Sequence, residues 1–142
     1  SASGWIARAR RVLDEEGLVD CVERGYLLLP EARRCIGKGE VAAAEAKFDE
    51  VAHIGERFGD FDLINLGRQG RARALIKLGS IAEGASLLDE VMVAVTASEV
   101  SPLSAGIVYC SVISACFEMF DLRRAREWTS ALTRWCAAQP KA

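Results

Sequence analysis

Few residues in this 142-residue chain are of the types that carry catalysis or bind metals. The single histidine, His53, stands between the apolar residues Val51 and Ile54, so on a helix it lies beside candidate core residues. A catalytic or ligating histidine needs partners of matched chemistry, and the chain has no Gly-x-Ser-x-Gly motif to place a nucleophile. We therefore expect no catalytic residue, no metal site and no cofactor, and an enzyme is the least favoured class of function.

The five cysteines do not follow a pattern that binds zinc or builds a disulfide framework. Their number is odd, no Cys-x-x-Cys pair occurs, and free cysteine is a common small core residue. We expect all of them to be reduced, which favours a cytoplasmic location. They are Cys21, Cys35, Cys110, Cys116 and Cys136.

Two further patterns are better explained by structure than by chemistry. The acidic pairs Asp49–Glu50 and Asp89–Glu90 recur at a spacing of 40 positions, whereas a catalytic pair of carboxylates is expected once. Recurrence of this kind predicts a solvated helix face. The glycine-rich string GRQGRAR at 67–73 has no preceding strand and no Gly-Lys-Ser/Thr, so it does not predict a nucleotide-binding loop.

The elements that must position these residues follow a repeat of about forty positions. Gly39 opens the string GEVAAAEAKFDEV, Gly79 opens GSIAEGASLLDEV 40 positions later, and a weaker copy starts at Phe120, 41 positions after Gly79. Such a period is typical of stacked helical hairpins that share one core. The positions five, nine and twelve after each start are Ala44, Phe48 and Val51, then Gly84, Leu88 and Val91, then Ala125, Thr129 and Leu132.

Apolar spacing and turn residues predict an all-α domain over 1–142, with six to seven helices and no strand. We expect a leading helix at 4–16 and hairpins at 19–58, 61–97 and 102–139. Pro30 predicts a kink or a break in the second helix. Ser80 with Glu83 has the spacing of a capping box, Asp121 is expected to cap the last helix, and Pro102 suits a first helical turn. Gly84 predicts a close contact between the two helices of its hairpin.

Composition narrows the classes of partner. Hydrophobic residues make up 51% of the chain and the formal net charge is −2, so nothing recommends nucleic acid or an anionic membrane as a partner. No apolar run approaches the roughly 20 residues of a membrane span. The chain begins Ser-Ala-Ser-Gly without methionine, and we expect it to be a fragment of a longer protein.

The Gly-x4-Ala-x3-Phe-x2-Val pattern from Gly39, repeated from Gly79, resembles the second-helix consensus of tetratricopeptide repeats over about 20–138. The departures are a period longer than the usual 34 or so, Phe120 in place of glycine, and Thr129 in place of a large apolar residue. The stretches 21–32, 56–63 and 108–140 look like the repeat arms of MalT-like, LuxR-type transcriptional regulators of actinobacteria. The resemblance implies a right-handed solenoid of about three antiparallel hairpins, here without the ATPase and helix-turn-helix modules of such regulators. HEAT-like repeats are the alternative, since their period is also near 40.

The resemblance also implies a concave groove, lined by the first helix of each hairpin, in which a partner peptide or helix lies. The family's groove offsets point to Tyr26, Leu29, Arg33, Gln69, Arg73, Lys77, Cys110, Ser111, Ser114 and Glu118. Arg33 and Arg73 each stand six residues before a repeat turn, and either can grip a carboxylate in bidentate fashion. Between 63 and 82 the chain has four basic residues and no acid, which favours an acidic partner segment.

Three functions remain open from the sequence. The first is a protein-interaction or sensory arm of a bacterial transcriptional regulator, and the second is a small-molecule sensor that holds its effector among Tyr26, Arg33, Arg73 and the apolar helix at 103–120. The third is a structural solenoid linker, whose groove is filled by its own side chains and whose arginines form a solvated face. Chaperone C-terminal tails are disfavoured as ligands, because the positions of the usual Lys and Asn clamp hold Leu29, Pro30, Gln69 and Gly70. We also expect self-association through apolar ends, with Trp5, Trp128 and Trp135 as candidates, although core packing is the favoured role of Trp128.

Overall fold

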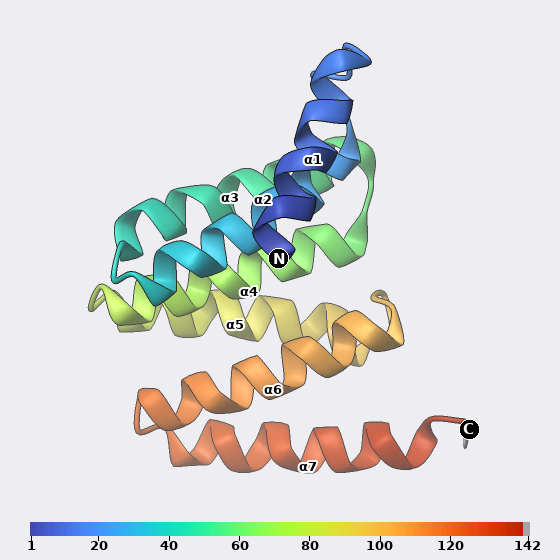
Figure 1. Ribbon diagram of the computed structural model, residues 1–142. Coiled ribbons are helices and arrows are strands. Elements are labelled where there is room, and N and C mark those ends of the chain that lie inside the picture. The colour runs from blue at the N-terminus through green and yellow to red at the C-terminus, as the bar shows by residue number, and fades with distance from the viewer. Residues whose placement is uncertain (141–142) are drawn as a thin grey trace.

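The computed structural model describes residues 1–140, which form seven α-helices and no strand. Six of them make three successive antiparallel pairs, stacked as in Figure 1, in a helical repeat arrangement. The all-α prediction is confirmed, and the handedness of the solenoid stays a prediction. The helices are α1 (Ala2–Glu15), α2 (Val22–Gly37), α3 (Val41–Phe58), α4 (Phe61–Lys77), α5 (Ile81–Thr96), α6 (Pro102–Glu118) and α7 (Leu122–Ala138).

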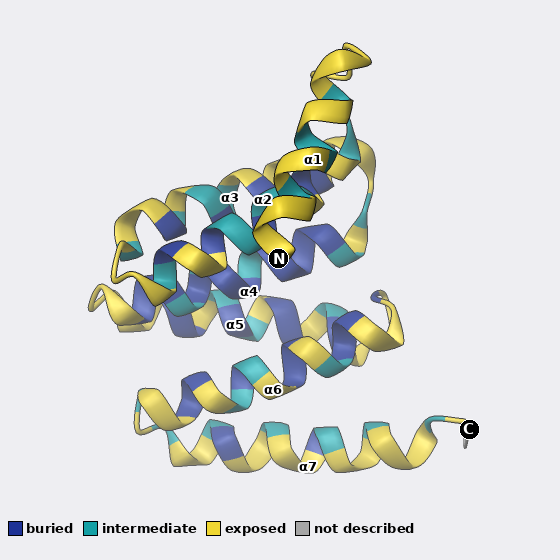
Figure 2. Ribbon diagram, in the orientation of Figure 1, coloured by how far each residue is buried: buried dark blue, intermediate teal, exposed yellow. Residues whose placement is uncertain are grey.

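One apolar core runs through α2 to α7. Among its fully buried side chains are Leu63 of α4, Leu88 and Met92 of α5, and Val108 of α6. In Figure 2 the buried residues are most frequent on α4, while α1 and the outer side of α7 are largely exposed. α4 is therefore the central helix, since it contacts α3, α5, α2 and α6.

Glycines allow the helices around α4 to approach closely. A Cβ atom on Gly67 would lie 2.6 Å from the backbone nitrogen of Ala52 in α3, and one on Gly84 of α5 would lie 2.8 Å from the carbonyl oxygen of Ala72. Backbone atoms cannot yield to such contacts without moving a whole helix. The close contact predicted for Gly84 within its hairpin is thus confirmed.

The turns inside the three hairpins share one backbone conformation. Gly39 and Gly79 follow the first helices of their hairpins with φ of +77° and +91°. Phe120 occupies the corresponding turn between α6 and α7 with φ of +57°. This residue is 88% exposed. Left-handed backbone is unfavourable for a residue with a Cβ atom, so the third turn keeps the geometry of the other two at a cost.

Helix caps follow the predictions at most sites. Asp60 caps α4 by accepting a hydrogen bond from the Leu63 N–H at 3.0 Å, and Asp121 caps α7 in the same way through Arg124 at 3.0 Å. Pro102 lies in the first turn of α6. The capping box predicted for α5 is wrong, because the Ser80 side chain makes no capping hydrogen bond.

Of the kink or break predicted near Pro30, the break is wrong, and the kink stays a prediction. α2 is helical without interruption from Val22 to Gly37, with Pro30 inside it. Leu29 and Ala32, on either side of Pro30, are both buried, so tertiary packing holds the turn that lacks one backbone donor.

Of the three tryptophans considered for apolar ends, only Trp5 is exposed, and self-association stays a prediction. Trp128 and Trp135 are half-buried and pack against the core, where the Trp135 ring lies 5.7 Å from that of Tyr109. Trp5 is exposed and lies beneath the guanidinium of Arg8. None of the described helices combines the length and the apolar character needed to cross a membrane.

Candidate functional site

The most distinctive surface feature is a cavity of about 430 Å³ formed by α2, α3, α4 and α6. Five of the predicted groove residues line it, namely Arg33, Gln69, Arg73, Lys77 and Ser111. The other lining residues are Ile36, Phe48, Gly70 and Ile107. We call this site, with its nine lining residues, the basic cavity.

Helical spacing brings the polar side chains of the basic cavity together. Gln69, Arg73 and Lys77 are four residues apart on α4, so they share one face of that helix. Arg33 reaches the same cavity from α2 and Ser111 from α6, because both helices pack against α4. Three positive charges thus meet at one site.

Glu118 of α6 supplies a negative charge beside this cluster. Its carboxylate accepts a hydrogen bond from Nη2 of Arg73, and its other oxygen lies 3.9 Å from Nζ of Lys77. Arg73 also donates to the hydroxyl oxygen of Ser111 at 3.1 Å, and Gln69 donates to the same oxygen. The side chains of α4 and α6 are therefore tied together along one edge of the basic cavity.

Two donors in the cluster lack partners within the described chain. The side chain of Arg33 is exposed and makes no hydrogen bond or ion pair with any residue of 1–140. Nε of Arg73 is buried and has no hydrogen-bond partner among those residues. Buried donors without partners are uncommon in folded proteins, so Arg73 retains capacity to bind an acceptor.

Apolar side chains form the rest of the basic cavity. Gly70 leaves room for the ring of Phe48, with which a Cβ atom at position 70 would collide. Ile36 is half-buried and Ile107 is exposed, so both present apolar surface to the cavity. The site therefore combines an apolar wall with a cationic edge.

The remaining predicted groove residues lie outside the basic cavity. Leu29 is 4% exposed and belongs to the core, so it does not line the basic cavity. Tyr26 donates its hydroxyl proton to Asp60 at 2.8 Å, and burial together with this hydrogen bond raises the pKa of Tyr26. Ser114 donates to the carbonyl oxygen of Cys110 at 2.9 Å, within its own helix.

α6 exposes more apolar surface than its sequence predicts. Its composition indicates a helix buried between neighbours, yet Leu103 is 77% exposed and Phe117 is 57% exposed. Ile107 lies on the same side of the helix, since these residues follow helical spacing. This stripe, which we call the α6 apolar stripe, leads into the basic cavity at Ile107.

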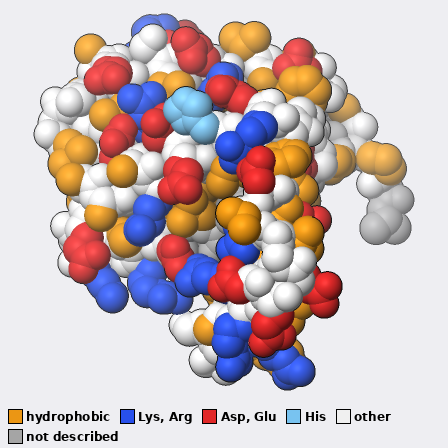
Figure 3. Space-filling model, turned by 90° about the horizontal axis from the view of Figure 1, so that it is seen from above, with side chains coloured by type: hydrophobic (Ala, Val, Ile, Leu, Met, Phe, Trp, Pro, Cys, Tyr) orange, Lys and Arg blue, Asp and Glu red, His pale blue; other side chains and the backbone are white. Residues whose placement is uncertain are grey.

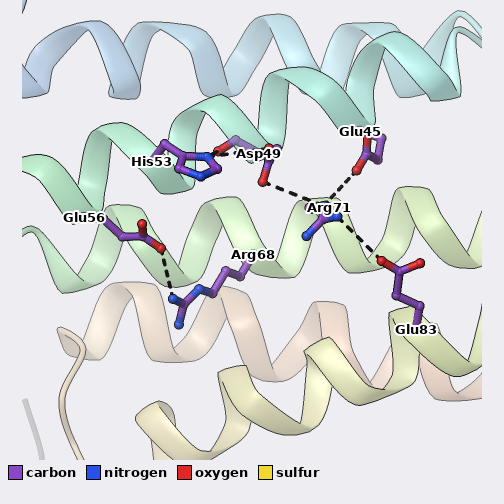
Figure 4. A network of polar contacts seen from close by, with 7 residues as sticks. All are labelled: Glu45, Asp49, His53, Glu56, Arg68, Arg71 and Glu83. Carbon is purple, nitrogen blue, oxygen red and sulfur yellow. Dashed lines mark hydrogen bonds and ion pairs between the residues drawn. The ribbon is translucent and has the colours of Figure 1, made fainter.

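A second polar cluster joins α3, α4 and α5 (Figure 4). Arg71 donates a hydrogen bond of 2.7 Å to Glu45 and lies within 4 Å of Asp49 and Glu83. The hydrogen bond with Glu45 is the main cause of a raised pKa of Arg71. His53 is exposed and its Nδ1 lies 2.8 Å from the carbonyl oxygen of Asp49.

This second cluster has the character of a structural network. Its cation is saturated by carboxylates, and no group of three potential metal ligands occurs among residues 1–140. Across the face seen in Figure 3, basic and acidic side chains are interspersed. The basic cavity differs from such a surface because its cations outnumber the acid beside them.

Comparisons with protein-family models, curated proteins and solved structures found no match to this chain. The likeness to tetratricopeptide arms of bacterial regulators therefore stays a prediction from the sequence.

Proposed function

We propose that this chain is a protein-interaction or sensory arm of a larger bacterial transcriptional regulator, acting in the cytoplasm. It binds an acidic segment of a partner protein at the basic cavity. The observation that supports this most is the convergence of Arg33, Arg73 and Lys77 from two helices on one cavity, with Glu118 as the acid beside them.

The α6 apolar stripe supports a partner of mixed character. Leu103 and Phe117 expose large apolar side chains along the same helix that supplies Ser111 and Ile107 to the cavity. A partner with acidic and apolar residues in alternation along one face would match both surfaces. Apolar contacts supply the affinity, and the cations set the orientation and the salt dependence of binding.

A purely structural solenoid would fill the groove with its own side chains. Glu118 does so for Arg73 and Lys77, but nothing in 1–140 does so for Arg33. Arg33 is exposed, which fits a solvated face as well as a binding site, so the effect of Arg33 substitutions on binding distinguishes the two functions.

Selection of peptides from a random display library on the folded chain tests the proposal. We expect the selected peptides to be acidic and apolar, and to lose about tenfold or more in affinity for Arg33→Glu, because a charge reversal replaces attraction by repulsion. Arg126→Glu on α7 is the matched control, since it carries the same charge change outside the basic cavity. Peptides that bind the Arg33→Glu and Arg126→Glu variants equally well would refute the proposal.

A further inference from the structure

The basic cavity also has the size and polarity of a small-molecule site. Its volume of about 430 Å³ falls within the range of ligand pockets, roughly 300–1,000 Å³. Such pockets are mostly apolar, with a few polar groups that fix the orientation of the ligand. Here Ile36, Phe48 and Ile107 provide the apolar wall, and the polar groups gather at one edge.

The polar edge is specific for a negative charge. Arg33, Arg73 and Lys77 contribute three cations, whereas no acid lines the cavity itself. Glu118, from just outside the lining, neutralises part of this charge through Arg73 and Lys77. The side chain of Glu118 is 37% exposed, and exposed ion pairs are weak, so a ligand carboxylate can compete with it.

The guanidinium of Arg73 has one donor, Nε, without a partner in the described chain. Its Nε is buried and unpartnered, while its Nη2 already bonds a carboxylate oxygen of Glu118. Nε and a terminal nitrogen of a guanidinium together match the two oxygens of one carboxylate. Because Nε is buried while Glu118 is in place, a ligand carboxylate can take both nitrogens only by displacing Glu118, and it then satisfies the donor that Glu118 leaves without a partner.

We propose that the basic cavity binds a small amphipathic carboxylate, of the medium-chain fatty-acid class. The carboxylate takes the place of Glu118 on Arg73 and Lys77 and is also attracted by Arg33. The hydrocarbon chain lies against Phe48, between Ile36 and Ile107. Glu118 is then an internal competitor that sets the affinity for the ligand. This proposal goes beyond the binding of a partner protein, because the ligand needs only the cavity and not the α6 apolar stripe.

Calorimetric titration of the folded chain with sodium octanoate tests the proposal, with 1-octanol and sodium acetate as comparison ligands. Octanoate should bind more tightly than either, because only octanoate has both the charge and the chain. Glu118→Gln should bind octanoate about fivefold more tightly, since the competing charge is gone, and Arg33→Gln about fivefold more weakly. Glu127→Gln on α7, which removes a more exposed acid outside the cavity, should leave binding unchanged.

Several results would overturn the proposal. Absence of octanoate binding to both the wild type and Glu118→Gln at millimolar concentration is one, and equal binding of octanol and octanoate is another. Equal affinities of Glu118→Gln, Arg33→Gln and Glu127→Gln would place the bound octanoate elsewhere. Acidic peptides that depend on Arg33, together with no octanoate binding, would overturn this inference while the proposed partner binding stands.

Discussion

Phe120 holds a backbone conformation that glycine adopts at the two equivalent turns. Its φ of +57° lies in the left-handed region, as do those of Gly39 and Gly79. The turn cannot relax freely, because Asp121 directly after it caps α7 and the N–H of Asp121 bonds the carbonyl of Cys116 at 2.8 Å. We therefore predict that Phe120→Gly is more stable than Phe120→Ala.

The size of the effect follows from opposing terms. Left-handed backbone costs a residue with a Cβ atom about 1–2 kcal/mol, whereas glycine loses about 0.4–1 kcal/mol more on folding because its unfolded chain is freer. Glycine should thus exceed alanine by about 1 kcal/mol at position 120. The ring of Phe120 is 88% exposed, so its removal changes the free energy of unfolding by only about 0.5 kcal/mol.

Urea unfolding followed by circular dichroism measures these differences, and a thermal melt should show a gap of about 3–5 °C between the two variants. Gly79→Ala is the reverse control, because it adds a Cβ atom at the equivalent left-handed turn position. A Cβ atom there meets nothing within 4 Å, so its expected loss of about 1 kcal/mol reflects the backbone alone. The reasoning fails if Phe120→Ala is as stable as Phe120→Gly while Gly79→Ala is destabilised.

Three further predictions concern packing, pH and charge. Gly67→Ala should lower the free energy of unfolding by about 1–3 kcal/mol in urea titrations, because its Cβ atom would meet the backbone of Ala52. Gly37→Ala is the control: its Cβ atom would meet nothing within 4 Å, so it should not destabilise α2. Burial raises the pKa of Asp62, but hydrogen bonds from the N–H (2.7 Å) and hydroxyl (2.5 Å) of Ser101 outweigh it and leave this pKa below its ordinary 3.8. The ionised Asp62 therefore stabilises the fold fully above about pH 4, and this stabilisation is lost as the pH falls further. Asp62→Asn should be less stable than the wild type at pH 7 and nearly as stable at pH 2. A stability difference that does not change with pH would contradict this. Arg33→Gln should raise the melting temperature slightly at low salt and not in 0.5 M or so NaCl, because it removes repulsion from Arg73; a loss of stability would show instead that Arg33 makes a stabilising contact.

The helices were predictable because their ends are marked by residues with one local role. Gly39, Gly79 and Asp121 stand at the boundaries found in the structure. The errors arose where local and tertiary preferences compete. Pro30 predicts a break from its own geometry, but buried neighbours keep α2 continuous. Ser80 has φ and ψ of −82° and 60°, which is not the extended geometry in which a capping serine reaches its donors.

The site was predictable to the extent that it follows the repeat. Arg33 and Arg73 share a repeat position, so finding one groove residue points to the next. Leu29 is one turn from Arg33 on the same side of α2, yet it is buried in the core, and its spacing alone could not show this. Phe48 was missed because its consensus position indicates core packing; it is indeed buried, and it lines the cavity where its ring packs against Gly70.

The repeat also explains why charge accumulates at this cavity. Stacked repeats place residues at equivalent repeat positions side by side, so a groove residue interacts with the equivalent residue of the next repeat. Lys77 and Glu118 are counterparts two residues before their turns, and their opposite charges meet at 3.9 Å. Arg33 and Arg73 are counterparts of equal charge, and both line the basic cavity. Recurrence alone does not mark a site, since the acidic pairs at 49–50 and 89–90 recur as well. The recurring arginines differ because they converge on one cavity, where an anionic ligand between them turns their repulsion into affinity.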